Sequence, residues 1–233
     1  MVSLYLIFYA CLELRFPDVK TNPGPQRPVP GACRILCSNV RGLSKNLSDV
    51  TVASSQYDLL LCSETLVSDR RHMSELLVPG FGHPVLLCRD GMPRARGMAV
   101  YVRDGYGAFR QLKFECGCCE MLVFRVCGAR QNFYVLSLYR NPDLDDRIYD
   151  CLLTAMAAVQ PADASASFLF VGDLNGNHQV WLGSTTTNRH GVVGLDFATV
   201  SGCDQLVIGQ THARGGTLDL LMTDVPDLIQ VAR

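Results

Sequence analysis

Four apolar stretches of this sequence each end in side chains that can bind a metal ion or a phosphate group. Asn39 follows the first stretch, Glu64 the second, Tyr139 the third, and Asp173 with Asn175 the fourth. Strand ends that point the same way would bring these side chains into one pocket. Carboxylate and amide oxygens suit Mg²⁺ or Mn²⁺ rather than zinc. Since such a cation polarises a phosphoryl oxygen, the pattern predicts phosphoester cleavage.

Each motif also has a purely structural explanation. Gly172–Asn175 (GDLN) has the composition of a turn that follows a strand. Ser63–Thr65 (SET) suits the N-cap of a helix. The recurrence of polar groups at four strand ends is what favours a functional site over four unrelated turns.

The elements that must position these side chains are short apolar runs separated by turns. Eight runs predict β-strands, at residues 34–38, 58–62, 84–88, 98–102, 120–127, 132–138, 167–171 and 218–222. Several consecutive runs are too close together for helical crossovers, so much of the sheet should be antiparallel. Two sheets packed face to face with helices outside, an α/β sandwich, is the expected arrangement.

One helix is strongly indicated between Asp143 and Gln160. Its apolar residues recur at intervals of three and four, which places them on one face of a helix. Asp143 can cap the first turn, and Pro161 ends the helix. Further helices are expected after Gly42 and around residues 194–200.

Composition limits the possible partners. The chain is 48 % hydrophobic and carries a formal charge of −1, from 21 basic and 22 acidic residues. These values exclude a disordered chain and a protein that binds nucleic acid through overall charge alone. A nucleic-acid partner therefore requires a local basic patch or a bound metal. The best local patch, RDGMPRARG, contains Arg94 and Arg96, and it also suits an ordinary solvated hairpin loop.

The eleven cysteines lie largely within strand-like runs. Cysteines placed in this way are typical of small buried hydrophobes in a reducing compartment, which predicts an intracellular protein of the cytoplasm and nucleus. The cluster Cys116–Cys119 (CGCC) also permits zinc binding. Because the sequence offers no clean second half-site, the cluster is interpreted as structural, with zinc as the alternative.

Residues 1–30 are predicted to be separate from a folded domain at 31–233. They begin with an apolar run, Val2–Leu12, that is shorter than the roughly 20 residues of a membrane span. The run also lacks the basic start and the small-residue cleavage site of a secretory signal. We therefore expect no stable membrane span.

The segment DVKTNPGP, ending at Pro25, resembles the 2A-like ribosome-skipping peptides. That resemblance implies release of the nascent chain between Gly24 and Pro25. Lys20 departs from the pattern, which has Glu at this position. The alternative interpretation is a plain Pro/Gly turn. For the present protein we favour that alternative, in which the segment no longer causes skipping.

The order of the motifs in the body of the chain resembles the endonuclease/exonuclease/phosphatase superfamily. The similarity runs from about Cys33 to the last residue. Within that superfamily, the motifs most resemble the apurinic-endonuclease-like domain of non-LTR retrotransposons. The motifs that carry it are NVRG (from Asn39), SET, YRN (from Tyr139), GDLNGNHQVWLGS (from Gly172), NRHG (from Asn188), TH (from Thr211) and GTLDLL (from Gly216).

This resemblance implies a four-layer α/β-sandwich with two facing, mostly antiparallel sheets, incomplete at the C-terminus. It implies Mg²⁺-dependent (or Mn²⁺-dependent) nicking of one DNA strand, leaving a 3′-hydroxyl for reverse transcription. The implied partners are DNA and a reverse-transcriptase domain in a full-length parent. The oligomeric state is not indicated.

Residue roles follow from the same resemblance. Glu64 would ligate the metal, with Asn39 beside it. Asp173, helped by Asn175, would orient or deprotonate the attacking water. Further roles are phosphate contact for Tyr139 and Asn141, orientation of a catalytic histidine for Asp219, support of the site for His178, and DNA contact for Arg41, Arg94, Arg96 and Arg140. The Tyr-x-Asn spacing departs from the commoner Tyr-x-x-Asn of the family.

The catalytic histidine of the family's Ser-Asp-His motif has no counterpart after Asp219. This predicts weak or no activity for the chain, since losing one member of a cooperative catalytic group costs on the order of 10³ or more. His178 and His212 are candidate replacements. Two alternatives stay open, namely another enzyme on the same fold, such as a lipid phosphatase or repair nuclease, and a non-catalytic nucleic-acid- or protein-binding remnant.

Overall fold

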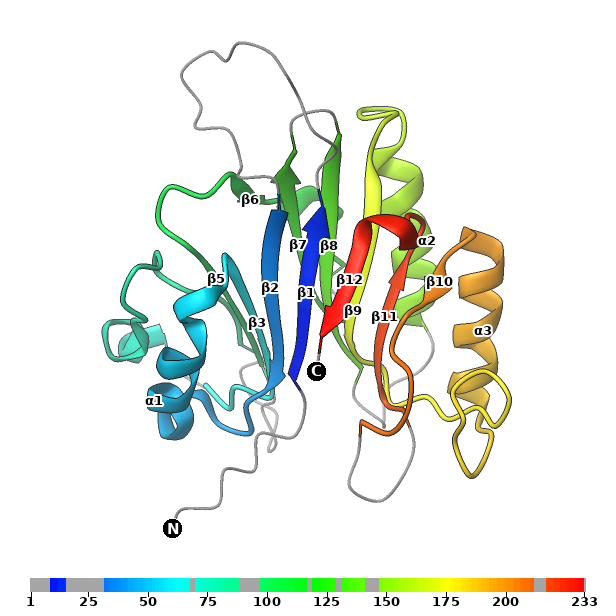
Figure 1. The fold of residues 1–233 in the computed structure, drawn as a ribbon, viewed down its shortest axis with the longest axis horizontal. Helices are drawn as coiled ribbons and strands as arrows, with labels where there is room; N and C mark the ends of the chain where they lie inside the picture. Colours follow the sequence, from blue (N-terminus) through cyan, green and yellow to red (C-terminus); the bar gives the residue numbers. More distant parts are fainter. Residues whose placement is uncertain are drawn as a thin grey trace.

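The computed structural model describes residues 9–15, 32–67, 70–88, 97–116, 119–128, 131–140, 147–211 and 217–232. They form two six-stranded sheets that face each other (Figure 1). The first sheet has the order β12-β1-β2-β3-β5-β4, with bounds Ile229–Ala232, Tyr9–Arg15, Ala32–Asn39, Leu59–Ser63, Met98–Val102 and Val85–Leu87. The second has the order β10-β11-β9-β8-β7-β6, with bounds Asp204–Gln205, Asp219–Thr223, Ser167–Asp173, Asn132–Tyr139, Glu120–Cys127 and Ala108–Arg110.

Three α-helices of the described residues complete the layers. Helix α1 (Leu43–Ala53) lies outside the first sheet, and α2 (Arg147–Val159) and α3 (Arg189–Ser201) lie outside the second (Figure 1). The order helix, sheet, sheet, helix confirms the predicted α/β-sandwich with two facing sheets.

Apolar residues on both faces of the strands explain the near-continuous hydrophobic runs. Alternate residues of a strand point to opposite faces. In β3, Leu59 and Leu61 therefore pack between the two sheets, whereas Leu60 and Cys62 pack under α1. Both faces of the sheet are covered, so neither face needs polar residues.

Two pairs of strands are parallel, and the remaining pairings of the named strands are antiparallel. β2 runs parallel to β3, and β8 runs parallel to β9. A helix lies between the strands of each pair in the sequence, α1 in the first and α2 in the second, as parallel crossovers require. The carboxyl ends of both pairs are where Asn39, Ser63, Tyr139 and Asp173 stand.

Strand β1 lies inside the first sheet, where it pairs antiparallel with both β2 and β12. The predicted boundary at residue 30 therefore falls between two neighbouring strands of one sheet. Part of the apolar N-terminal run supplies backbone hydrogen bonds to the domain that it was expected to precede.

The remaining differences from the sequence prediction concern short elements. β6, β10 and β12 have only two to four residues, too few to show a period of two. The predicted start of the second helix lies outside the described residues, and the helix is observed from Arg147 to Val159. Among the described helices, none combines the length and apolar character that crossing a membrane would require.

Candidate active site

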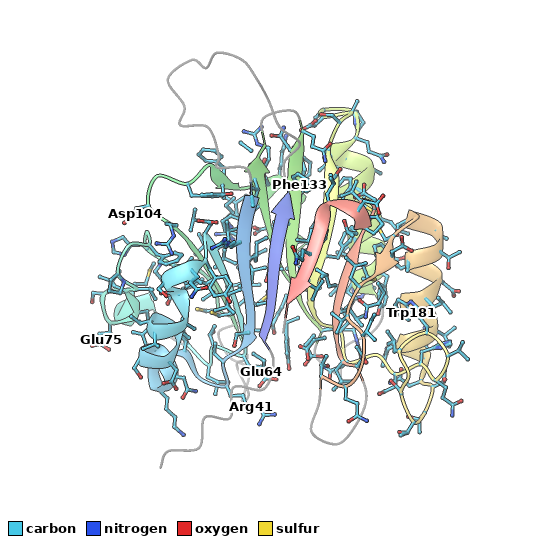
Figure 2. All side chains as sticks on the ribbon, in the orientation of Figure 1. Arg41, Glu64, Glu75, Asp104, Phe133 and Trp181 are labelled. Atoms are coloured by element: carbon cyan, nitrogen blue, oxygen red, sulfur yellow. The ribbon has the colours of Figure 1, made fainter. Side chains whose placement is uncertain are left out.

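The predicted site residues meet at one end of the two sheets. In the second sheet, Tyr139, Asp173 and Asp219 form a row across β8, β9 and β11, because Asp173 pairs with both of the others. In the first sheet, Asn39 pairs with Ser63 at the ends of β2 and β3, and Glu64 follows directly. Figure 2 shows Glu64 at the lower end of the first sheet.

A hydrogen bond joins the two sheets within the site. The buried hydroxyl of Tyr139, on β8, donates to Glu64 Oε1 over 3.1 Å. The loop that carries Glu64 is held in turn by the loop after β2, since the Gly42 amide donates to the Glu64 carbonyl over 2.8 Å. The Glu64 carboxylate is thus fixed from both sheets.

The site brings several acidic side chains close together. Burial, and then the nearby charges of Asp219 and Glu64, raise the pKa of Asp173 well above its usual value, although the Asn175 amide opposes the shift. Burial also raises the pKa of Asp219 to about 6, with a further contribution from Glu64. Three mutually repelling carboxylates at the edge of the core are what a bound cation would neutralise.

The loop after β9 is locked to the loop after β8. The Asn175 amide N–H donates to Asp173 Oδ1 over 2.9 Å, and the Asn175 side chain donates to the Arg140 carbonyl over 2.8 Å. Arg140 Nε donates to the Leu174 carbonyl over 2.7 Å. Since Arg140 is only 2 % exposed, its position suits holding this loop rather than the DNA contact that the sequence predicted.

Unfavourable backbone conformations concentrate at the same end. In the described chain, the residues other than glycine with positive φ are Arg41, Glu64, Leu66 and Asn175. Such conformations cost on the order of 1–3 kcal/mol each and are retained where the surrounding structure enforces them. Their position on the loops after β2, β3 and β9 indicates that the surrounding structure holds these loops in place.

Gly172 allows β8 and β9 to come close just before the row of Tyr139 and Asp173. Its φ is +153°, and a Cβ atom here would lie 1.8 Å from the Leu138 carbonyl oxygen. A narrow cavity of about 20 Å³ between the sheets is lined by Gly172, Leu138, Asn39 and Asp219, among others. The GDLN motif therefore needs its glycine for packing, and the next residue, Asp173, stands in the row with Tyr139 and Asp219.

The remaining predicted residues are divided between the site, its surroundings and the residues outside the described ranges. Arg41 is exposed beside Asn39, whose Oδ1 accepts from the Arg41 amide over 3.3 Å. His178 Nδ1 accepts from the Trp181 amide over 3.1 Å, so it organises the loop after β9. Asn141, Arg94, Arg96 and His212 lie outside the described residues.

Thr211 is a site residue that the sequence reasoning did not assign. Its hydroxyl oxygen accepts from the amides of Leu218 and Asp219, at 2.9 and 3.2 Å, and the hydroxyl lowers the pKa of Asp219 by hydrogen bonding to its carboxylate. A lone threonine eight residues before an aspartate carries no periodic signal. Only the resemblance motif that begins at Thr211 pointed to this position.

The chemistry of the donor set suits a hard divalent cation, although the three carboxylates are not gathered within 4.8 Å of one another as the side chains stand. Glu64, Asp173 and Asp219 offer carboxylate oxygens, and Asn39 offers an amide oxygen. Carboxylates and amides are the ligands that Mg²⁺ and Mn²⁺ prefer. The raised pKa values of Asp173 and Asp219 reflect the same grouping, because burial and the neighbouring acidic charges both disfavour ionisation of these carboxyls, while Arg140 opposes the shift at Asp173.

The fold is an α/β-sandwich with acidic and amide side chains gathered at one end of its two sheets. The model of the Endonuclease/Exonuclease/phosphatase family matches residues 36–228, so the chain belongs to that family. No protein with a curated description matches the chain significantly in sequence.

Solved structures share this fold at low sequence identity. The endonuclease domain of TRAS1, a telomere-specific non-LTR retrotransposon, is 14 % identical, with a TM-score of 0.59 over 82 % of this chain and 84 % of that one. The AP endonuclease LMAP from Leishmania major is 12 % identical, with a TM-score of 0.62 over 81 % and 78 %. An AP endonuclease from Archaeoglobus fulgidus is 15 % identical, with a TM-score of 0.54 over 84 % and 88 %.

Proposed function

We propose that this protein is a divalent-metal-dependent endonuclease that cuts one strand of DNA and leaves a 3′-hydroxyl end. The proposal rests on the proximity of three carboxyl groups, those of Glu64, Asp173 and Asp219, at the ends of the two sheets. The Tyr139 hydroxyl links the sheets there by a 3.1 Å hydrogen bond to Glu64. The DNA substrate is supported by the AP endonucleases and the retrotransposon endonuclease that share the fold.

The residues divide the chemistry between them. Glu64, with Asn39 beside it, would hold the divalent cation, and the chemistry that such an ion supplies is polarisation of a phosphoryl oxygen and compensation of the developing charge. Asp173 would accept a proton from the attacking water. The Asn175 amide fixes the Asp173 carboxylate through its 2.9 Å bond to Oδ1.

Tyr139 and Arg41 complete the proposed site. Tyr139 orients Glu64 and lies beside Asp173 in the sheet register, where its hydroxyl can also approach a phosphate. The exposed side chain of Arg41, next to Asn39, would contact the DNA backbone. The 3′-hydroxyl end would serve a reverse-transcriptase domain as primer, as the resemblance to the retrotransposon enzymes implies.

A second candidate function rests on the environment of Asp219. The family resemblance expects an imidazole at this carboxylate, and the described partner is the hydroxyl of Thr211. A threonine cannot act as the acid or base that a histidine provides near neutral pH. This observation favours slow cleavage, or a module that binds nucleic acid without cutting it.

A nicking assay on supercoiled plasmid with the full chain and Mg²⁺ separates these functions. The full chain is required because β1 belongs to the first sheet. Asp173→Ala and Glu64→Gln should abolish nicking, and the matched control Asp196→Asn, at an exposed position of α3, should leave it unchanged. Omitting the metal, or chelating it, should stop the reaction in the wild type.

The product ends test the chemistry of the nick. A DNA polymerase should extend the nicked strand directly if a 3′-hydroxyl was left, whereas a 3′-phosphate would block extension. Metal-dependent DNA binding without nicking would establish the binding module instead. Nicking that survives Asp173→Ala would refute the assignment of this site.

A further inference from the structure

We propose that Cys116, Cys119 and Cys151 form a thiolate site for a soft divalent metal ion, with Zn²⁺ as the expected ion. The site is separate from the oxygen-lined candidate active site, and its donors are of another chemical class. The sulfur atoms of the three residues all lie within 4.8 Å of one another. Among the described residues, this is the one group of three or more such donors gathered this closely.

The three cysteines come from separate elements that the fold brings together. Cys116 and Cys119 have the C-x-x-C spacing of a zinc half-site, at the end of the segment before β7. Cys151 lies on α2, which packs on the outer face of the same sheet. Helix α2 thus provides the additional ligand that the sequence alone could not pair with Cys116–Cys119.

The sulfur geometry is close to that of a tetrahedral site. A Zn–S bond of about 2.3 Å in tetrahedral geometry implies sulfurs about 3.8 Å apart. The observed separations, up to 4.8 Å, need an adjustment of about 1 Å, which is within reach of side-chain rotation. Cys119 is buried, whereas Cys116 and Cys151 are half-buried, so an ion has a route in from solvent.

The surroundings favour thiolates and leave room for a fourth donor. A pocket of about 360 Å³ beside Cys116 and Cys151 is also lined by Lys113, Arg147 and Asp150. Nearby cationic side chains stabilise the thiolate form of a cysteine. Water or the Asp150 carboxylate can take the fourth position from this pocket. Glu115 lines the pocket too, and both of its oxygens already bind Arg110, at 3.0 and 2.8 Å.

Cysteines elsewhere in the fold behave differently. Burial raises the pKa of Cys62 to about 12 and that of Cys33 above its usual range, so these thiols stay protonated in the core. They match the structural interpretation of the cysteines, whereas Cys116, Cys119 and Cys151 differ from them in having their sulfur atoms gathered within 4.8 Å of one another.

The metal form requires reduced cysteines. Cys116 is disulfide-bonded in this structure, whereas Cys119 and Cys151 are not part of a disulfide. Adding a phosphine reductant supplies the two electrons that convert this disulfide into two thiols. Binding of one Zn²⁺ by the three thiols then releases up to three protons to solvent as the thiolates coordinate.

The site lies on the outer face of the second sheet, behind the candidate active site. Cys119 immediately precedes Glu120, which pairs with Tyr139 across β7 and β8. Cys119 packs in the helix-side core, whereas Tyr139 packs between the two sheets. An ion at this position would fasten α2 and the start of β7 without touching the reacting groups.

Metal analysis of the full chain under phosphine reductant tests the proposal. Wild-type protein should carry one zinc per chain at the thiolate site. Cobalt substitution should give the sulfur-to-cobalt charge-transfer absorption of thiolate ligands, which an oxygen-only site cannot produce. Cys151→Ser and Cys119→Ser should weaken zinc binding at least tenfold, whereas the control Cys127→Ser, at the far end of β7, should bind normally.

A measurement on the wild type guards against variants that fail to fold. Zinc should protect the thiols of Cys116, Cys119 and Cys151 from alkylation, and leave Cys127 reactive. Absence of a thiolate–cobalt band in reduced protein would overturn the proposal. So would normal zinc affinity in folded Cys151→Ser, or alkylation that zinc does not slow at these three positions. These outcomes are independent of DNA nicking, so the two proposals fail separately.

Discussion

Replacing Asp219 by Asn should stabilise the metal-free protein at neutral pH. Burial raises the pKa of this carboxyl from 3.8 to about 6, so ionising it costs more in the folded chain than in the unfolded one. A shift of roughly 2 units corresponds to about 3 kcal/mol of unfolding free energy. Asparagine has the same shape, carries no charge and still accepts from the Thr211 hydroxyl.

The sign of the pH dependence follows from the raised pKa. Below about pH 4, Asp219 is protonated in the folded and the unfolded chain, so wild type and variant should be equally stable. As the pH rises through the folded pKa of about 6, the buried carboxyl of Asp219 has to ionise, and the wild type loses stability relative to the variant. The stability difference should grow from near zero to about 3 kcal/mol by pH 7.5. The lowered pKa of Asp173 in the variant adds to the change in the same direction.

Urea unfolding in the presence of a chelator, at a series of pH values, measures this difference. The control Asp196→Asn changes an exposed aspartate and should shift stability by less than about 0.5 kcal/mol. Adding Mg²⁺ should stabilise the wild type more than Asp219→Asn, because the cation offsets the charge that the variant lacks. A variant less stable than wild type at pH 7.5, or a difference that does not change with pH, would refute the reasoning.

Three further substitutions test how the site is held. Gly172→Ala places a Cβ 1.8 Å from the Leu138 carbonyl oxygen and should cost more than about 3 kcal/mol in urea unfolding. Arg140→Lys loses the 2.7 Å bond from Nε to the Leu174 carbonyl and should cost about 2 kcal/mol by the same measurement. Leu66 has a φ of 53° and a side chain that is 54 % exposed. Leu66→Gly relieves this conformation and should stabilise the protein by about 1 kcal/mol, seen as a higher thermal midpoint.

Matched controls separate these causes from general effects of the substitutions. Gly183→Ala introduces a Cβ at a positive φ with no atom within 4 Å, so it should cost only about 1 kcal/mol. An equal cost for the two glycine substitutions would contradict the close approach of β8 and β9. Leu112→Gly removes a similarly exposed leucine whose φ is not positive, and it should destabilise the protein.

The strands were predictable because both of their faces are buried. Runs such as Met98–Val102 and Glu120–Cys127 match the observed β5 and β7 residue for residue. Strand β1 was not predicted, since its hydrogen bonds come from β2 and β12. Such partners lie far away in the sequence, and the local composition of residues 1–30 resembles that of a detachable leader.

The site was predictable to the extent that it follows strand ends. Glu64, Tyr139, Asp173 and Asp219 were assigned from the ends of apolar runs and from the resemblance, and the structure brings them together. The burial of Arg140 was not predictable, because an arginine beside a catalytic motif has the same sequence signature whether it faces solvent or a buried carbonyl.

The position of β1 has a consequence for how the protein is made. A ribosome that released the chain between Gly24 and Pro25 would deliver residues 1–24 and the remainder as two polypeptides. Strand β12 would then lose its hydrogen-bonded neighbour, unless the short peptide returned to its place between β12 and β2. Lys20 departs from the glutamate of the skipping pattern, and a chain left whole supplies β1 and β12 to the same sheet.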